Sequence, residues 1–142
     1  MKTVRDILET KGHDVWCIEP GATVLDALRL MAEKEIGALV VMEGERVVGV
    51  LSERDYARKV VLLGRASPTT AVREIMTGAV IFTHPGQSIE ACMALVTEKR
   101  VRHLPVLREG RLVGLISIGD LVKSIIDDQK FIIEQLERYI SS

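Results

Sequence analysis

The segment GVLSERD at residues 49–55 recurs 65 positions later as GLISIGD at residues 114–120. The same offset relates the segments before it, so that PG at residues 20–21 corresponds to PG at residues 85–86. Further upstream, VRDIL at residues 4–8 matches VREIM 68 positions later, and the second copy has therefore lost three residues from the loop that follows. Internal repetition of this length predicts two similar half-domains that frame a pair of related clefts.

The composition indicates one compact domain, or two half-domains that share a core, since 47% of the 142 residues are hydrophobic. A formal net charge of -1 gives no general attraction for nucleic acid or for anionic lipid. The sequence contains no apolar run of the roughly 20 residues that a membrane helix needs, and its first residues lack the apolar core of a signal peptide. We therefore expect a cytoplasmic protein without a membrane partner.

Cysteine and histidine positions give no indication of a metal site. Cys17 and Cys92 lie in apolar contexts without C-x-x-C spacing, which favours buried free thiols over a disulfide or a redox pair. The three histidines show no i,i+4 pairing. We expect no metal centre.

Each copy shows the same order of extended and helical patterns. The first copy predicts a strand at 15–18, a helix at 24–34 capped by Thr23, a hairpin of strands at 38–42 and 46–51, and a helix from 52 to about 63. The second copy predicts a strand at 81–83, a helix at 88–99, strands at 103–107 and 111–116, and a helix from about 118. The linker at residues 64–70 is short, so the two halves must touch.

The domain boundaries expected from this pattern are a first repeat at 1–66, a second repeat at 67–128 and a C-terminal helical extension at 129–142. Apolar residues recur along the last helix at helical spacings: Val122, Ile125, Ile126, Ile133, Leu136 and Ile140. This face exceeds what one half-domain covers, and we interpret it as packing on the other half or on a second subunit. A terminal helix that folds back on its own core is the alternative.

The Ser-x-x-Asp motif at the end of both hairpins suggests the chemistry. A strand that turns into a helix at Ser52 or Ser117 leaves first-turn N–H groups unpaired, and together with the helix dipole these favour an anion such as phosphate. Asp55 and Asp120 can each accept two hydrogen bonds from adjacent hydroxyls, such as those of a ribose. The structural alternative is an N-cap paired with an acidic residue three positions later, which is worth about 1 kcal/mol.

These features resemble the CBS domain, named after cystathionine beta-synthase. The resemblance rests on the order helix, strand, helix, strand, strand, helix, on RHLPV at residues 102–106 and on the two Gly-h-h-Ser-x-x-Asp segments, and it covers roughly residues 3–60 and 71–128. It implies an α/β fold with mixed α+β sheets, in which two CBS repeats pack with pseudo-twofold symmetry as a Bateman module. The chain resembles the small stand-alone CBS-pair proteins of bacteria.

The resemblance also implies a regulatory role without a catalytic cofactor. Such pairs hold an adenosyl ligand (AMP, ADP, ATP, NAD or NADH, or S-adenosylmethionine) and usually form a homodimer. By this likeness Asp55 and Asp120 take the ribose hydroxyls, while Ser52 and Ser117 meet ribose or phosphate. The positions that would enclose the adenine are those near Cys17, Ile18, Phe82 and Thr83, together with Ala38 and Leu104. Phe82 departs from the Ser or Thr that the family often carries there.

The two copies differ in charge. Arg-His at residues 102–103 stands where the first copy has Gly-Ala at residues 37–38, and Arg54 has Gly119 as its counterpart. The cleft that we expect to bind the more phosphorylated group contains Ser52, Arg54, Asp55, Arg102 and His103. The Asp120 cleft should be less charged. The alternative to a ligand role is that Arg54 and Arg102 are ordinary solvated arginines. For His103 the alternative is a hydrogen-bonded residue at the start of a strand.

Three classes of function are compatible with these observations. The leading hypothesis is a non-catalytic module that binds an adenine nucleotide, senses energy or redox state and modulates an unidentified partner protein. An enzyme is disfavoured because the sequence shows no paired nucleophile and base, no phosphate-binding loop and no Gly-x-Gly-x-x-Gly motif. An adaptor or RNA-binding protein is disfavoured because the five aromatic residues are scattered and form no stacking surface.

Overall fold

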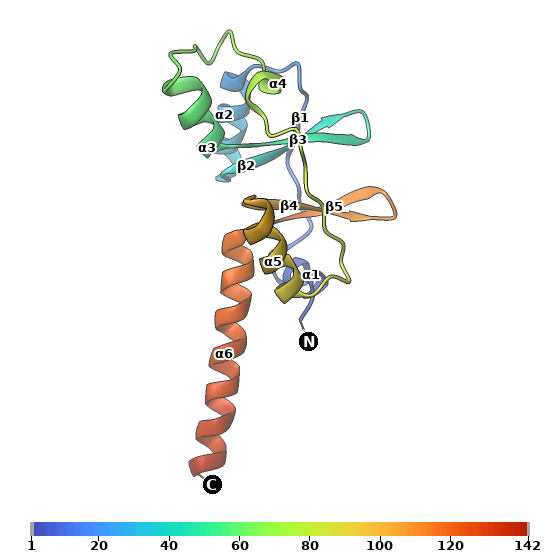
Figure 1. Cartoon of the computed structure of the whole chain (residues 1–142), viewed down its shortest axis with the longest axis vertical. Helices are drawn as coiled ribbons and strands as arrows, with labels where there is room; N and C mark the ends of the chain where they lie inside the picture. Colours follow the sequence, from blue (N-terminus) through green and yellow to red (C-terminus); the bar gives the residue numbers. More distant parts are fainter. Residues whose placement is uncertain (1, 142) are drawn as a thin grey trace.

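The computed structural model describes residues 2–141, which form two α/β halves and a long C-terminal helix (Figure 1). The mixed α/β fold and the repeated order of elements predicted from the sequence are confirmed. In chain order the elements are α1 (Val4–Lys11), β1 (Cys17–Ile18), α2 (Val24–Lys34), β2 (Ala38–Glu43), β3 (Arg46–Ser52), α3 (Glu53–Tyr56), the π-helical turn η1 (Ala57–Val61), α4 (Val72–Ile75), α5 (Ile89–Lys99), β4 (His103–Arg108), β5 (Arg111–Ser117) and α6 (Ile118–Ser141).

Helices α2 and α5 occupy equivalent positions and begin with equivalent caps. The hydroxyl of Thr23 accepts a hydrogen bond from the N–H of Asp26 at 3.1 Å, and the hydroxyl of Ser88 accepts one from the N–H of Ala91 at 3.1 Å. A cap of this kind stabilises a helix by about 1 kcal/mol. The caps place both helix starts where the sequence predicts them.

The two hairpins share an irregularity as well as a length. The pairing register of β2 and β3 shifts between Val41 and Met42, and that of β4 and β5 shifts between Val106 and Leu107, 65 positions later. Strand β1 pairs in parallel with β2 and extends the first hairpin to a three-stranded sheet. Both hairpins therefore end at the same place relative to their halves, with Ser52 and Ser117 as the last strand residues.

The predicted strand at residues 81–83 is wrong, because the chain there makes only one β-bridge, from Thr83 to Val106. In the first half, the N–H of Val40 donates to the carbonyl of Trp16 at 3.1 Å. The residue that corresponds to Val40 in the second half is Pro105, which has no N–H to donate. The second ladder loses this hydrogen bond, and the strand does not extend.

One helix prediction also needs correction. The helix expected from residue 52 to about 63 consists of α3 followed by η1, where the N–H of Leu62 donates to the carbonyl of Ala57 at 3.2 Å. This wider turn leaves Val60 buried, with 1% of its surface exposed. Helix α6 runs without a break from Ile118 to Ser141, so residues 129–141 continue the last helix of the second repeat.

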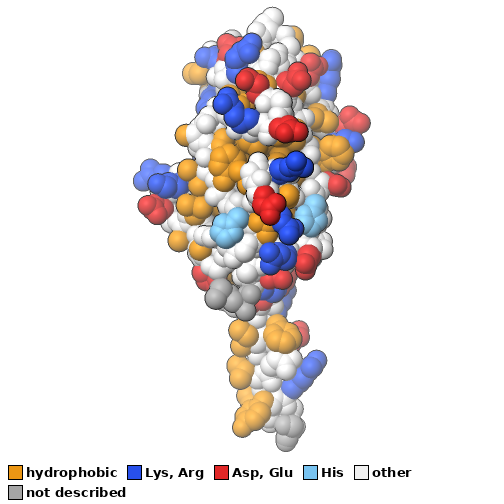
Figure 2. All heavy atoms as spheres, turned by 90° about the vertical axis from the view of Figure 1, so that its right-hand side faces the viewer, with side chains coloured by type: hydrophobic (Ala, Val, Ile, Leu, Met, Phe, Trp, Pro, Cys, Tyr) orange, Lys and Arg blue, Asp and Glu red, His pale blue; other side chains and the backbone are white. Residues whose placement is uncertain are grey.

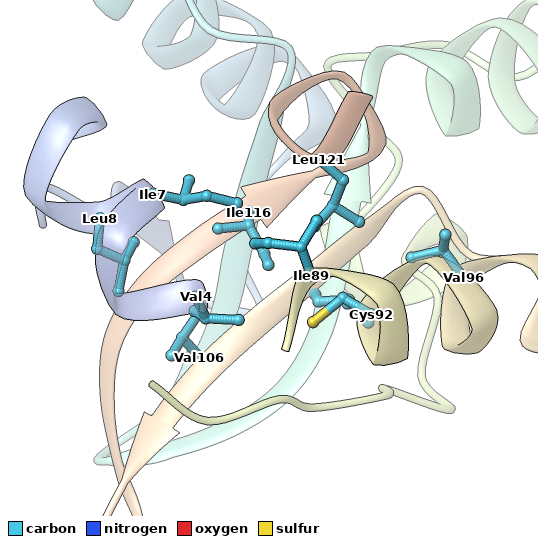
Figure 3. Packing of buried hydrophobic residues seen from close by; sticks show 10 residues of the cluster. Val4, Ile7, Leu8, Ile89, Cys92, Val96, Val106, Ile116 and Leu121 are labelled. Carbon is cyan, nitrogen blue, oxygen red and sulfur yellow. The ribbon is translucent and has the colours of Figure 1, made fainter. Parts of the chain in front are cut away.

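Each half takes its first helix from the other sequence repeat. Val4, Ile7 and Leu8 of α1 pack in the core formed by α5, β4, β5 and the start of α6, as Figure 3 shows. In the same way, Val72 and Ile75 of α4 pack in the core of α2, β2 and β3. Figure 1 accordingly places α1 beside α5 and α4 beside α2. The hydrophobic cores therefore combine residues from both repeats.

Backbone hydrogen bonds fix the two exchanged helices in equivalent ways. The N–H of Val4 donates to the carbonyl of Gln87 at 2.9 Å, and the N–H of Val72 donates to the carbonyl of Ala22 at 2.8 Å. Because the exchange is reciprocal, neither repeat has a complete core without the other. The repeat boundaries given above remain predictions about the duplicated sequence.

Candidate functional site

The first Ser-x-x-Asp motif forms a complete capping box at the junction of β3 and α3. One carboxylate oxygen of Asp55, Oδ2, accepts hydrogen bonds from the N–H and the hydroxyl of Ser52 at 2.9 and 3.1 Å. The N–H of Asp55 donates to the hydroxyl of Ser52 at 3.2 Å. The other oxygen, Oδ1, lies 3.2 Å from the ammonium of Lys59. The N-cap arrangement, which was the structural alternative to a ligand site, is thus present. Its hydrogen bonds use only Oδ2 of the Asp55 carboxylate.

The second motif is capped similarly but carries an additional cation. Asp120 Oδ2 accepts a hydrogen bond from the N–H of Ser117 at 2.8 Å, and the N–H of Asp120 donates to the hydroxyl of Ser117 at 3.1 Å. The ammonium of Lys11 lies 2.6 Å from the same Oδ2 and also donates to the carbonyl of Leu115 at 2.7 Å. Burial acts to raise the pKa of Asp120, but these hydrogen bonds and the charge of Lys11 outweigh it, so the pKa lies below its usual value.

The first motif opens onto a cavity of about 430 Å³ between the two halves. The five residues expected to form the more phosphorylated site all line it: Ser52, Arg54, Asp55, Arg102 and His103. Residues 77–81, which follow α4, form another part of the wall. The cavity is within the range of roughly 300–1,000 Å³ that is usual for small-molecule sites.

Arginines dominate the charge of this cavity, which we call the arginine-lined cavity. Arg54, Arg58, Arg100 and Arg102 line it, and Asp55 is the only acidic residue in its lining. Within residues 2–141, none of the four guanidinium groups forms an ion pair. Desolvation and the like charges of Arg102 and Arg58 lower the pKa of Arg54, although an arginine remains charged at neutral pH. Asp55 acts in the opposite direction on Arg54, but one carboxylate against four guanidinium groups leaves the site with a local positive charge.

Two of these arginines were missed in the sequence. Arg58 lies four residues after Arg54, and this i,i+4 spacing on a helix is a signal that would have placed both on one face. Arg100 ends α5 in the left-handed conformation, with a φ of 54°. Non-glycine residues adopt this conformation only rarely, so its position could not be read from the helical pattern.

His103 lies between the two Ser-x-x-Asp motifs. Burial and the charge of Lys11 lower its pKa, while the carboxylates of Asp120 and Asp55 act in the opposite direction. The net shift is downward, and His103 is therefore mainly neutral at pH 7. His103 pairs with Ser117 across the second hairpin and lines the same cavity as Ser52 and Asp55, so it borders both motifs.

The remaining predicted site residues lie elsewhere. The side chains of Ala38, Thr83 and Leu104 are buried, with 7%, 6% and 1% of their surface exposed, and the hydroxyl of Thr83 lies 3.4 Å from the sulfur of Cys92. Ile18 packs against the core of the first half, whereas Cys17 is exposed and borders a separate hollow near the hairpin turns. For these five residues, contact with an adenine through backbone groups remains a prediction.

The Cys17 result corrects one sequence expectation, since a buried thiol was predicted there and only Cys92 is buried. Cys17 belongs to a two-residue edge strand with an outward-facing position, and the apolar neighbours in the sequence do not cover it.

Asp120 borders a hollow of about 270 Å³ between α1 and α6. Ser117 does not line that hollow or the arginine-lined cavity.

Metal-binding clusters and membrane-spanning helices are both absent from the part of the chain that the structure describes. Residues 2–141 contain no group of three or more His, Cys, Asp or Glu side chains arranged to hold a metal ion. Over the same residues, no helix has both the length and the apolar content that crossing a bilayer requires.

Comparison with known proteins agrees with the repeated architecture. The sequence model of the CBS domain family matches residues 3–62 and 72–127 of this chain. The chain therefore belongs to the CBS domain family and contains two such domains in tandem.

Individual relatives extend over almost the whole chain. The solved structure of a candidate signal-transduction protein with CBS domains from Burkholderia ambifaria MC40-6 is 54% identical, covers 90% of this chain and 96% of its own, and has a TM-score of 0.85. The mitochondrial CBS domain-containing protein CBSX3 of Arabidopsis thaliana is 34% identical over 97% of this chain and 71% of its own length. The CBS domain pair of protein MJ0100, solved with 5-methylthioadenosine and S-adenosylmethionine, shares the fold at 20% identity, with a TM-score of 0.79 over 90% of this chain and 98% of its own.

Proposed function

We propose that this chain is a regulatory module that binds an adenine nucleotide with more than one phosphate in the arginine-lined cavity. The observation that carries this proposal is the set of four arginines without internal ion pairs at the mouth of a Ser-x-x-Asp motif. The general tendency of CBS pairs to bind adenosyl ligands, as the MJ0100 pair does, supports the ligand class. The relatives named above are described as CBS-domain or signal-transduction proteins, which supports a regulatory, non-catalytic role.

The number of arginines favours a polyphosphate. A phosphate monoester brings a charge of about -1.5 to -2 at neutral pH, which two arginines already balance. Four arginines and a neutral His103 therefore suit ADP, ATP or a dinucleotide such as NAD(H) better than AMP or S-adenosylmethionine. The planar guanidinium groups can each donate two parallel hydrogen bonds to phosphate oxygens.

Asp55 is suited to the ribose end of such a ligand. Its Oδ2 holds the capping box, whereas its Oδ1 contacts only the ammonium of Lys59, whose side chain is 41% exposed. The Lys59 ammonium also donates to the carbonyl of Ile75 at 2.9 Å, so it keeps a hydrogen-bond partner when a ribose hydroxyl takes its place at Oδ1. In the proposal, Asp55 keeps its cap through one oxygen and binds the sugar through the other.

Occupancy of the cavity supplies a mechanism of regulation. Arg54 and Arg58 come from the first repeat, whereas Arg100 and Arg102 come from the second. The positive charges of the two pairs repel each other and so push the two halves apart. A bound polyphosphate neutralises this repulsion and links the halves. The ligand thereby favours one relative arrangement of the halves, and a partner protein that recognises that arrangement responds to nucleotide concentration.

Calorimetric titration tests this proposal. We expect ATP and ADP to bind more tightly than AMP, and AMP more tightly than adenosine. Arg54→Gln and Arg102→Gln should each weaken ATP binding about ten- to a hundredfold, since a hydrogen bond to a charged group is worth about 1.5–3 kcal/mol. Arg29→Gln, on the exposed surface of α2, is the matched control and should leave affinity unchanged. Wild-type protein that binds none of these ligands, or variants that bind ATP as tightly as wild type, would contradict the proposal.

We further propose that the chain forms a homodimer through α6. From residue 129 to residue 141 the helix is exposed throughout, and Figure 2 shows hydrophobic side chains on its protruding end. The residues at alternating spacings of four and three are Val122, Ile126, Gln129, Ile133, Leu136 and Ile140. A strict repeat of this kind is the seam of a coiled coil, in which the partner is another helix of the same pattern.

Charge favours an antiparallel second copy as that partner. In an antiparallel pair, Val122 meets the end of the partner helix near Ile140, and the seam residues match in order from both ends. In this alignment Lys123 lies within one turn of Glu137 of the second copy at both ends of the pair, and these two attractions outnumber the one repulsion among the flanking charges, between Lys130 and its own copy near the two-fold axis. A parallel alignment would instead bring identical residues to the same level. A cytoplasmic location for this dimer stays a prediction from the sequence.

A further inference from the structure

The two halves differ in the length of the exchanged helix. Helix α1 contains eight residues and α4 contains four, although both begin with the same sequence pattern. The three residues that the first copy has in excess lie between this pattern and the Pro-Gly shared by both copies. They allow α1 to continue for another turn, and the last residue of that turn is Lys11.

Lys11 occupies a place that the backbone occupies in the other half. Next to the arginine-lined cavity, the N–H of Thr77 donates to the carbonyl of Val50 at 2.9 Å. The counterpart of Val50 is Leu115, whose carbonyl accepts a hydrogen bond from the Lys11 ammonium at 2.7 Å. The same ammonium lies 2.6 Å from Asp120 Oδ2. A single cation therefore connects the strand end and the carboxylate of the second motif.

The surroundings of the second motif do not favour a phosphate. The positions equivalent to Arg54 and to Arg102–His103 are Gly119 and Gly37–Ala38, which have no cationic side chains. The carboxylate of Glu53 lies beside Gly37, where the other half has Arg102 beside Ile118. Lys2 and Lys123 also line the hollow that Asp120 borders, but the cation that pairs with Asp120 is Lys11.

We propose that Lys11 acts as an internal occupant of the second Ser-x-x-Asp motif, so that each chain holds one nucleotide, in the arginine-lined cavity. The first motif also holds a lysine, but Lys59 lies 3.2 Å from Asp55, whereas the Lys11 ammonium lies 2.6 Å from Asp120 and so holds more firmly the carboxylate that a ribose would otherwise engage. Lys11 is therefore a specificity-determining residue, which converts a duplicated pair of motifs into one ligand site and one structural contact. This inference rests on the proposed function, since it concerns how many nucleotides the chain binds.

Stoichiometry measured by calorimetry with ATP and with adenosine, which carries no phosphate, tests the role of Lys11. Wild type should bind one ligand per chain. Lys11→Met removes the cation and retains the length of the side chain, and it should create a second site that binds adenosine at least about tenfold more tightly than the wild-type second motif does. Adding Asp120→Asn to Lys11→Met should abolish this second site, and Lys11→Arg, which keeps the cation, should restore a single site. Lys99→Met, at the end of α5, is the control and should also bind one nucleotide.

The outcomes separate this inference from the proposed function. Two nucleotides bound per wild-type chain, or a Lys11→Met chain that remains folded by circular dichroism and binds only one, would overturn the role of Lys11 while leaving the nucleotide function intact. Absence of binding to both the wild type and the variant would reject the nucleotide function and this inference with it. Native mass spectrometry of the same samples counts the bound ligands independently.

Discussion

His103 connects the two Ser-x-x-Asp motifs at the scale of a single residue. Its imidazole is affected by Asp55 on one side and by Asp120 and Lys11 on the other, and Arg102 lies next to it in the sequence. Because burial and Lys11 keep it mainly neutral, it offers a hydrogen-bond donor without adding charge to the arginine-lined cavity. A bound phosphate would reverse this balance and favour the protonated form.

The lowered pKa of His103 predicts a pH dependence with a defined sign. An unfolded histidine titrates near pH 6.5, so between that pH and the lower pKa of the folded state the unfolded chain binds more protons. The free energy of unfolding should therefore decrease as the pH falls below about 6.5. Urea unfolding at pH 7.5 and pH 5.5 measures this loss, which should be smaller in His103→Gln and unchanged in the control His84→Gln. An equal loss in all three proteins would contradict the assignment.

The residues of the arginine-lined cavity could be predicted in part. Comparing the two repeats pointed to Arg54, Arg102 and His103, because their counterparts are small and uncharged. Lys11 could not be assigned in the same way, since its contact with Asp120 spans 109 residues and depends on the length of α1. A repeat shows which residues are duplicated, but not which side chain of one repeat reaches the other.

At the scale of the elements, the exchange of α1 and α4 depends on one glycine in each hairpin. A Cβ atom on Gly114 would lie 2.6 Å from a methyl group of Leu8 in α1, and one on Gly49 would lie 2.5 Å from the sulfur of Met76, just after α4. Both distances are shorter than packed side chains allow, so each exchanged helix lies directly against a strand that has no side chain at that point. Conventional helix and strand patterns do not reveal this contact, which is why the exchange was not predicted.

This contact predicts the effect of Gly114→Ala. The added methyl group must displace Leu8, which is 1% exposed and tightly surrounded, and overpacking of this kind typically costs about 1–3 kcal/mol. Gly78→Ala is the control, because a Cβ atom there meets no neighbouring atom within 4 Å. In a double-mutant cycle with Leu8→Ala, the added methyl group should fill part of the cavity, so the combined loss of stability in urea should be less than the sum. Strictly additive losses would show that α1 does not rest on β5 in this way.

At the scale of the whole molecule, the structure is one body with a protruding helix. Leu121 and Ser124 are the buried residues of α6, and the end of the helix extends away from both halves (Figure 1). The sequence predicted the apolar face but left its partner open between the other half, a second subunit and the core of its own half. The exposure of Ile133, Leu136 and Ile140 shows that the other half does not cover them.

The dimer proposed for α6 can be tested by light scattering. Wild type should have about twice the mass of a 15.7 kDa chain. Ile133→Lys places a charge in the centre of the seam and should produce a monomer, whereas Gln135→Lys, outside the seam, should leave the dimer intact. A wild-type monomer, or an Ile133→Lys protein that still dimerises, would show that α6 does not mediate self-association.

The most direct test of the nucleotide function is a crystal structure of the wild-type protein with ATP in excess. We predict one ATP molecule per chain, with its ribose at Asp55 and its phosphates between Arg54 and Arg102, while Lys11 remains on Asp120. ATP bound at Asp120 in place of Lys11, or an arginine-lined cavity that stays without nucleotide at saturating ATP, would contradict the central claim.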